Sequence, residues 1–159
     1  MKHLNSKPLL IRIASSTVLA LLAVLVVYAV AMNRMMTRLN NEVPSDLDYS
    51  TTRVSDNDLF RVSYVSSQDV VPVNRMHQWT LHVETLDGQP VEDASIIVDG
   101  DMPQHGHGLP SSPQVTKYLG DGDYLVEGMK FQMGGWWVMD FTINVADQTD
   151  AVHFNMMLK

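Results

Sequence analysis

The alternation of apolar and polar residues in the last hundred residues is the feature that most restricts the fold. Over residues 137–145 every second side chain is large and apolar, and residues 79–83 show the same alternation. Successive side chains of a β-strand point to opposite faces of a sheet, so this pattern predicts antiparallel strands with one buried and one solvated face. After residue 59 there is no comparable helical periodicity.

Turn-forming residues divide residues 59–159 into short segments of this kind. Glycine, aspartate, asparagine and proline separate strands that the sequence predicts at residues 60–65, 78–84, 94–98, 115–119, 124–127, 137–145 and 152–158. About seven short strands in about 100 residues are typical of an immunoglobulin-like antiparallel β-sandwich. The chain contains no cysteine, but a domain of this size buries enough apolar surface to fold without disulfides.

The N-terminal part of the chain has a different character. Residues 13–32 contain no charged side chain and are rich in leucine, valine and alanine. As a helix this run would span about 30 Å, the thickness of the hydrocarbon core of a bilayer. Lys2, Lys7 and Arg12 precede it, so the positive-inside rule predicts a cytoplasmic segment at residues 1–12, a single transmembrane helix and an extracytoplasmic domain.

Cleavage of this segment is the alternative to a retained anchor. Residues 29–31, Ala-Val-Ala, have the small-x-small form of a signal-peptidase site. The apolar run is longer than the core of an ordinary signal peptide, and this favours the anchor. The polar stretch 33–58 is predicted to be a linker that leads into the domain at residues 59–159.

The charge distribution argues against nucleic acid as a partner. Residues 1–40 carry five basic side chains and no acidic one, whereas residues 41–159 carry all 18 acidic side chains and six basic ones. Nucleic-acid binding requires a basic surface, and the predicted domain is strongly acidic.

A loop rich in histidine and glycine is the main candidate for a functional site. Residues 99–110 read Asp-Gly-Asp-Met-Pro-Gln-His-Gly-His-Gly-Leu-Pro, and in an extended chain the rings of His105 and His107 leave the same side. Imidazole binds copper and zinc, and the thioether of Met102 is soft enough to select Cu(I). The alternative is that both histidines hold backbone groups of a tight turn and bind no metal.

Further candidate ligands lie elsewhere in the sequence. His77 has the same strand parity as Trp79, so we expect it to point inward at one end of the sandwich. The remaining candidates are thioethers, which equally often fill gaps in a core: Met76, Met129 and Met133. Asp99 and Asp101 are expected to orient the imidazoles as outer acceptors.

No enzyme is expected from this sequence. A nucleophile elbow, a phosphate-binding glycine loop and a His-Glu-x-x-His zinc motif are all missing. Trp136 has outward parity beside the inward-facing Trp137. As an exposed tryptophan it would mark a partner surface, shield a metal or pack on an edge loop.

Three segments together resemble the YtkA-like and FixH-like families of small bacterial membrane-anchored domains. They are Met-Pro-Gln-His-Gly-His-Gly at 102–108, Asn-Arg-Met-His-Gln-Trp at 74–79 and Tyr-Leu-Val-Glu-Gly-Met at 124–129. The first string is distinctive and the other two are generic. The chain departs from the family pattern at residues 134–135, Gly-Gly, where a Pro-Gly or similar turn is expected.

The resemblance implies an immunoglobulin-like sandwich on one N-terminal helix in the bacterial inner membrane. FixH-like proteins are associated with copper supply and with assembly of haem–copper oxidases. We therefore expect a periplasmic copper-binding protein for metal handling or respiratory oxidase assembly, with an oxidase or its assembly factors as partner. The alternative is a metal-free interaction module whose loop end docks on a membrane complex, with structural histidines and with Trp136 in the contact surface.

Overall fold

The computed structural model describes residues 24–32, 36 and 42–159, and the chain divides into two compact units, 1–42 and 43–159. Residues 24–32 are α-helical. Within the described residues, no helix is both long and apolar enough to cross a membrane. The predicted cytoplasmic segment 1–12 and residues 13–23 of the predicted anchor lie outside the described residues.

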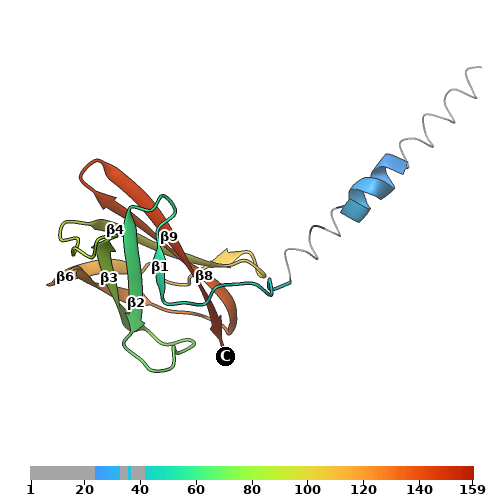
Figure 1. Ribbon diagram of the computed structural model, residues 1–159. Helices are drawn as coiled ribbons and strands as arrows, with labels where there is room; N and C mark the ends of the chain where they lie inside the picture. Colours follow the sequence, from blue (N-terminus) through green and yellow to red (C-terminus); the bar gives the residue numbers. More distant parts are fainter. Residues whose placement is uncertain (1–23, 33–35, 37–41) are drawn as a thin grey trace, which may run out of the picture. The chain divides into compact units, whose positions relative to one another are not determined.

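The second unit consists of β-strands that form two antiparallel sheets (Figure 1). One sheet has the order β1-β2-β3-β7-β6 and the other has the order β5-β4-β8-β9. The strands are β1 (Thr52–Val54), β2 (Phe60–Ser66), β3 (His77–Thr85), β4 (Ser95–Met102), β5 (His107–Gly108), β6 (Gln114–Gly120), β7 (Asp123–Met129), β8 (Gly135–Val145) and β9 (Gln148–Leu158).

The core lies between the two sheets and consists of the alternating apolar residues. Trp79 on β3 and Phe141 on β8 come from opposite sheets, are both almost fully buried, and have ring centroids 6.4 Å apart. Phe154 on β9 packs edge-on against Tyr64 on β2 at 5.0 Å. These contacts confirm the predicted all-β sandwich, because the period-2 pattern places one face of each strand in a shared core.

Two segments differ from the sequence-based boundaries. β4 continues beyond residue 98 to Met102, so the histidine-rich segment begins as a strand and not as a loop. β1 at Thr52–Val54 falls within the stretch predicted to be a linker. It pairs with β2, and its neighbour Asp56 donates a backbone hydrogen bond to the carbonyl of Ala151 on β9. Short edge strands are hard to predict because two or three residues carry little periodicity.

One end of the sandwich gathers the segments that carry the candidate ligands. β3 begins opposite the end of β7, β4 ends opposite the beginning of β8, and residues 130–134 connect β7 directly to β8. We call this end, with the connections 67–76, 103–106 and 130–134, the loop end. The opposite end carries the β8–β9 turn.

A buried carboxylate attaches the β1–β2 turn to the β8–β9 hairpin. Asp150 is 2% exposed and accepts hydrogen bonds from the backbone of Asn57, Leu59 and Ala151 and from the side-chain amide of Asn57. Burial alone would raise the pKa of Asp150, but these bonds and one from Ser55 outweigh burial and lower it to about 2.

We predict that Asp150→Asn lowers the free energy of unfolding at pH 7 by about 1.5–3 kcal/mol, because hydrogen bonds to a charged acceptor are lost from a buried site. A carboxylate whose pKa is lower in the folded state than in the unfolded state stabilises the fold above the unfolded pKa. This stabilisation is lost as the pH falls. The variant should therefore show a weaker loss of stability between about pH 5 and pH 2 in urea unfolding. Asp147→Asn, at an exposed turn position nearby, is the control. Equal pH profiles for wild type and Asp150→Asn would contradict the assignment.

Candidate metal site

A tight hairpin between β4 and β5 presents the two motif histidines. Met102 pairs with His107 across the two strands. The carbonyl of Met102 accepts hydrogen bonds of 2.9 Å from the backbone N–H groups of both His105 and Gly106. Gly106 has φ 66°, a left-handed conformation that glycine adopts without penalty. The Gly-His-Gly sequence thus closes the turn between the two strands.

The rings of His105 and His107 lie side by side. Their centroids are 5.8 Å apart with an interplanar angle of 31°. Metal–imidazole bonds are about 2.0 Å in zinc sites, so an ion lies about 3 Å from each bound ring centroid and rings about 5–6 Å apart suit a shared ion. His105 is exposed and His107 is half-buried, which leaves one side of such an ion open to solvent.

Met102 lies behind His107 on the inner side of the hairpin. Directly paired residues of antiparallel strands project to the same face, so the thioether of Met102 and the imidazole of His107 share a side. Met102 is fully buried, and a side chain at Gly135 would collide with its terminal methyl group. The glycine at position 135 therefore makes room for the candidate sulfur ligand.

Gln132 is the polar partner of His107, and no motif in the sequence identified it. Its Nε2 lies 2.8 Å from Nδ1 of His107 and 3.2 Å from the carbonyl of Gly108. The same Nδ1 is 3.2 Å from the Gly108 carbonyl. The amide N–H of Gln132 donates to Nδ1 in this arrangement, which puts the ring proton on Nε2. Metal binding through Nε2 would require the proton to move to Nδ1, where the Gly108 carbonyl can accept it, and the Gln132 amide to turn.

The two aspartates expected to orient the imidazoles lie on the exposed face of β4. Asp99 accepts a hydrogen bond from the backbone of Gly100. Burial, followed by the charges of Asp140 and Asp99, raises the pKa of Asp101. The hydrogen-bond partners of His107 are Gln132 and Gly108 instead.

His77 lies at the same end of the sandwich but does not touch the hairpin histidines. It is 6% exposed, and its inward orientation agrees with its strand parity. Its ring is 5.7 Å from Phe131, Phe131 is 5.1 Å from Trp137, and Trp137 is 5.9 Å from His107. Two aromatic rings thus stand between His77 and His107. The three histidines are therefore not gathered around one point.

The three other thioethers occupy different environments at the loop end. Met129 is fully buried and pairs with His77 across β3 and β7. Met133 is partly buried against the core, and its carbonyl accepts a 3.1 Å hydrogen bond from Trp137. Met76 is 63% exposed. Of these three methionines, only Met129 has a candidate imidazole as its direct cross-strand neighbour.

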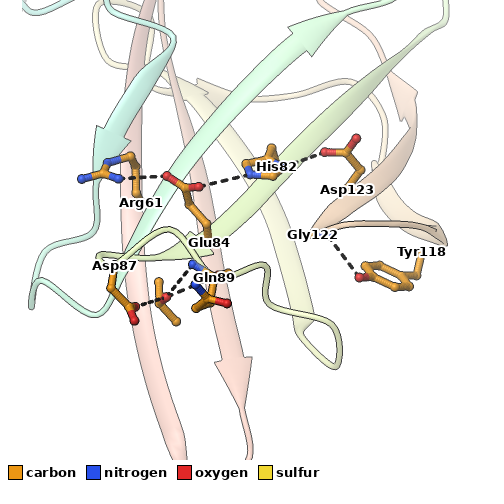
Figure 2. Close-up of polar contacts among 9 residues, drawn as sticks. Arg61, His82, Glu84, Asp87, Gln89, Tyr118, Gly122 and Asp123 are labelled. Carbon is orange, nitrogen blue, oxygen red and sulfur yellow. Dashed lines mark hydrogen bonds and ion pairs between the residues drawn. The ribbon is translucent and has the colours of Figure 1, made fainter.

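His82 lies on the outer face of its sheet, and both ring nitrogens contact carboxylates. Its Nδ1 lies 2.8 Å from Asp123, and its Nε2 lies 3.6 Å from Glu84. Glu84 in turn pairs with Arg61 at 2.9 Å on the neighbouring strand. Figure 2 shows these four side chains in one line across β2, β3 and β7. This line of contacts links the three strands on the outer face of the sheet.

His153 makes an analogous contact on the outer face of the other sheet. Its Nδ1 lies 2.6 Å from Asp140 and its Nε2 lies 3.0 Å from Asp56. The hydrogen bond to Asp140 outweighs partial burial and raises the pKa of His153. Two carboxylates thus stabilise the imidazolium form, which is not the form that binds metals.

The expectation of an exposed Trp136 is wrong. Its side chain is 9% exposed and donates a 3.0 Å hydrogen bond from Nε1 to Asn155. Asn155 also bonds the backbone carbonyl of Asp48, so the segment before β1 runs along this face. Strand parity identified the outward direction of Trp136 but carried no information about the segment that covers it.

We predict that imidazole C–H resonances will separate the buried from the carboxylate-bound histidine in a pH titration. Desolvation lowers the pKa of His77 from its ordinary value of 6.5, although a hydrogen bond to the Arg75 carbonyl opposes this, and the partners of His153 raise its pKa above 6.5. His153→Gln and His77→Gln assign the two signals. A midpoint for His77 above that of His153 would contradict this order.

Comparison with known proteins adds one family and one solved structure. A family model described as YtkA-like matches residues 49–142. The solved structure, titled "ZirS C-terminal Domain", has 15% sequence identity and a TM-score of 0.38, and the alignment covers 72% of this chain and 80% of that chain. No curated protein matches. The matched region spans more than half of the sequence and contains the histidine hairpin, and the chain belongs to the YtkA-like family.

Proposed function

We propose that this protein binds copper in the bacterial periplasm and serves metal handling or respiratory oxidase assembly. The observation that carries the proposal is the hairpin, where the rings of His105 and His107 lie 5.8 Å apart. Met102 adds a thioether on the same side as His107. Two imidazoles and one thioether form a ligand set that suits copper, and thioether sulfur favours Cu(I).

The partial exposure of this set suits transfer of a metal more than permanent storage. His105 is exposed and His107 is half-buried, so the ligands of a partner protein can reach a bound ion. A catalytic role would need a general base near the ion, and the sequence supplies no evident one. We therefore propose binding without catalysis.

The proposed architecture is an immunoglobulin-like sandwich on a single transmembrane helix at residues 13–32. The orders β2-β3-β7-β6 and β4-β8-β9 support the first part, because immunoglobulin constant domains have a four-strand and a three-strand sheet with this connectivity. The uncharged run 13–32 and the preceding basic residues support the second part. The domain would then face the periplasm, where a haem–copper oxidase or its assembly factors are the proposed partners.

We predict that the full-length chain in detergent micelles binds Cu(I) under anaerobic, reducing conditions, and that His105→Ala/His107→Ala weakens the hairpin site at least 100-fold. The reason is loss of both imidazole ligands from a site that keeps only one thioether. Competition with a colorimetric Cu(I) chelator measures the affinity. The matched control is His82→Ala/His153→Ala, which removes two histidines that are held by carboxylates.

Equal affinity in wild type and the hairpin variant would remove the hairpin from the site. Absence of any copper binding by wild type would favour the metal-free interaction module. Thermal unfolding provides a second readout, because a ligand at 100 times its Kd stabilises the native state by about 2.7 kcal/mol. The midpoint should rise with copper in wild type and in the control.

A further inference from the structure

A β-bulge turns Met129 into the core opposite His77. β3 and β7 pair His77 with Met129 but Trp79 with Val126, so β7 contains one extra residue between these pairs. Gly128, with φ 82°, lies within this bulge. Without the extra residue, alternation from the buried Val126 would turn residue 129 outward. Bulges re-aim side chains in this way and are enriched beside functional sites.

The imidazole of His77 has an unused nitrogen in this buried position. Its Nδ1 lies 3.2 Å from the carbonyl of Arg75, a pure acceptor, which assigns the ring proton to Nδ1. Its Nε2 is buried and has no hydrogen-bond partner among the described residues. A buried hydrogen-bond acceptor without a partner lowers the stability of the fold. Such atoms in native proteins need an explanation, and a bound ion is one. The lone pair of Nε2 is therefore available.

A pocket open to solvent borders His77. It has a volume of about 370 Å³ and is lined by Met76, His77, Glu127 and Gly128 among others. Met76 offers an exposed thioether next in sequence to His77. The carboxylate of Glu127 favours a cation in the pocket. A soft cation can thus approach His77 through the pocket, where a carboxylate attracts it.

We propose that His77 and Met129 form a second, buried Cu(I) site, separate from the hairpin. Cross-strand neighbours have Cβ atoms about 4.5–5.5 Å apart, within reach of one ion held by Nε2 and a thioether sulfur. Cu(I) is the metal that a neutral imidazole and a thioether select. The choice of copper rests on the proposed function, whereas the ligands are different residues, with Phe131 and Trp137 between the two sites.

The test uses the full-length chain in detergent micelles and counts Cu(I) per chain by chelator competition under reducing conditions. Wild type should bind two Cu(I). His105→Ala/His107→Ala should keep one, and adding Met129→Leu to that variant should remove it. Leucine nearly conserves the volume of methionine, so the exchange costs less than about 1.5 kcal/mol in a core. Circular dichroism checks the fold, and Met139→Leu is the matched core control.

X-ray absorption at the copper edge gives a second readout, because it reports the atoms bound to copper and not the stability of the fold. In the His105→Ala/His107→Ala variant, the single Cu(I) should have one sulfur neighbour, and His77→Phe should abolish binding. Retention of this copper after Met129→Leu, or a copper environment without sulfur, would overturn the buried site.

The outcomes separate the two proposals. One Cu(I) in wild type that is lost in His105→Ala/His107→Ala would overturn the buried site and leave the hairpin site standing. One Cu(I) that survives in that variant but is lost with Met129→Leu would support the buried site and remove the hairpin site.

Discussion

Packing of aromatic rings between the two sheets at the loop end is the interaction on which the rest of the structure depends. Trp79 comes from one sheet, Trp137 comes from the other, and Phe131 lies between them in the short β7–β8 connection, with centroids 6.1 Å and 5.1 Å from the two tryptophans. All three are almost fully buried. Large rings fix the separation of the sheets because cores are close-packed. The same rings also keep His77 apart from His107.

The histidines of this domain divide into two chemical groups according to their surroundings. His82 and His153 contact carboxylates on the outer faces of the two sheets, and for His153 these contacts raise the pKa of the ring. His77 at the loop end contacts aromatic rings and a backbone carbonyl instead, and burial lowers its pKa, which favours the neutral ring that binds metals. For His77, His82 and His153 the distinction follows from strand parity, because successive side chains of a strand point to opposite faces of the sheet.

The two candidate copper sites differ in access and therefore in the role each supports. At the hairpin, His105 is exposed and a bound ion can pass to a partner. At the bulge, His77 is 6% exposed and Met129 is fully buried, so exchange would be slower. A protein with one open and one enclosed site can take up metal at one and retain it at the other.

Alternation along each strand was sufficient to predict the all-β sandwich and the inward face of His77, since side-chain direction in a strand is a local property. The hairpin histidines were recognisable from the Gly-rich motif, although residues 103–106 form a turn and not an extended chain. Tertiary structure alone decided that Trp136 is covered, that Gln132 contacts His107, and that Phe131 and Trp137 separate the histidines. These facts depend on contacts between segments far apart in the sequence, and the β7 bulge shifts the parity that local reasoning assumes.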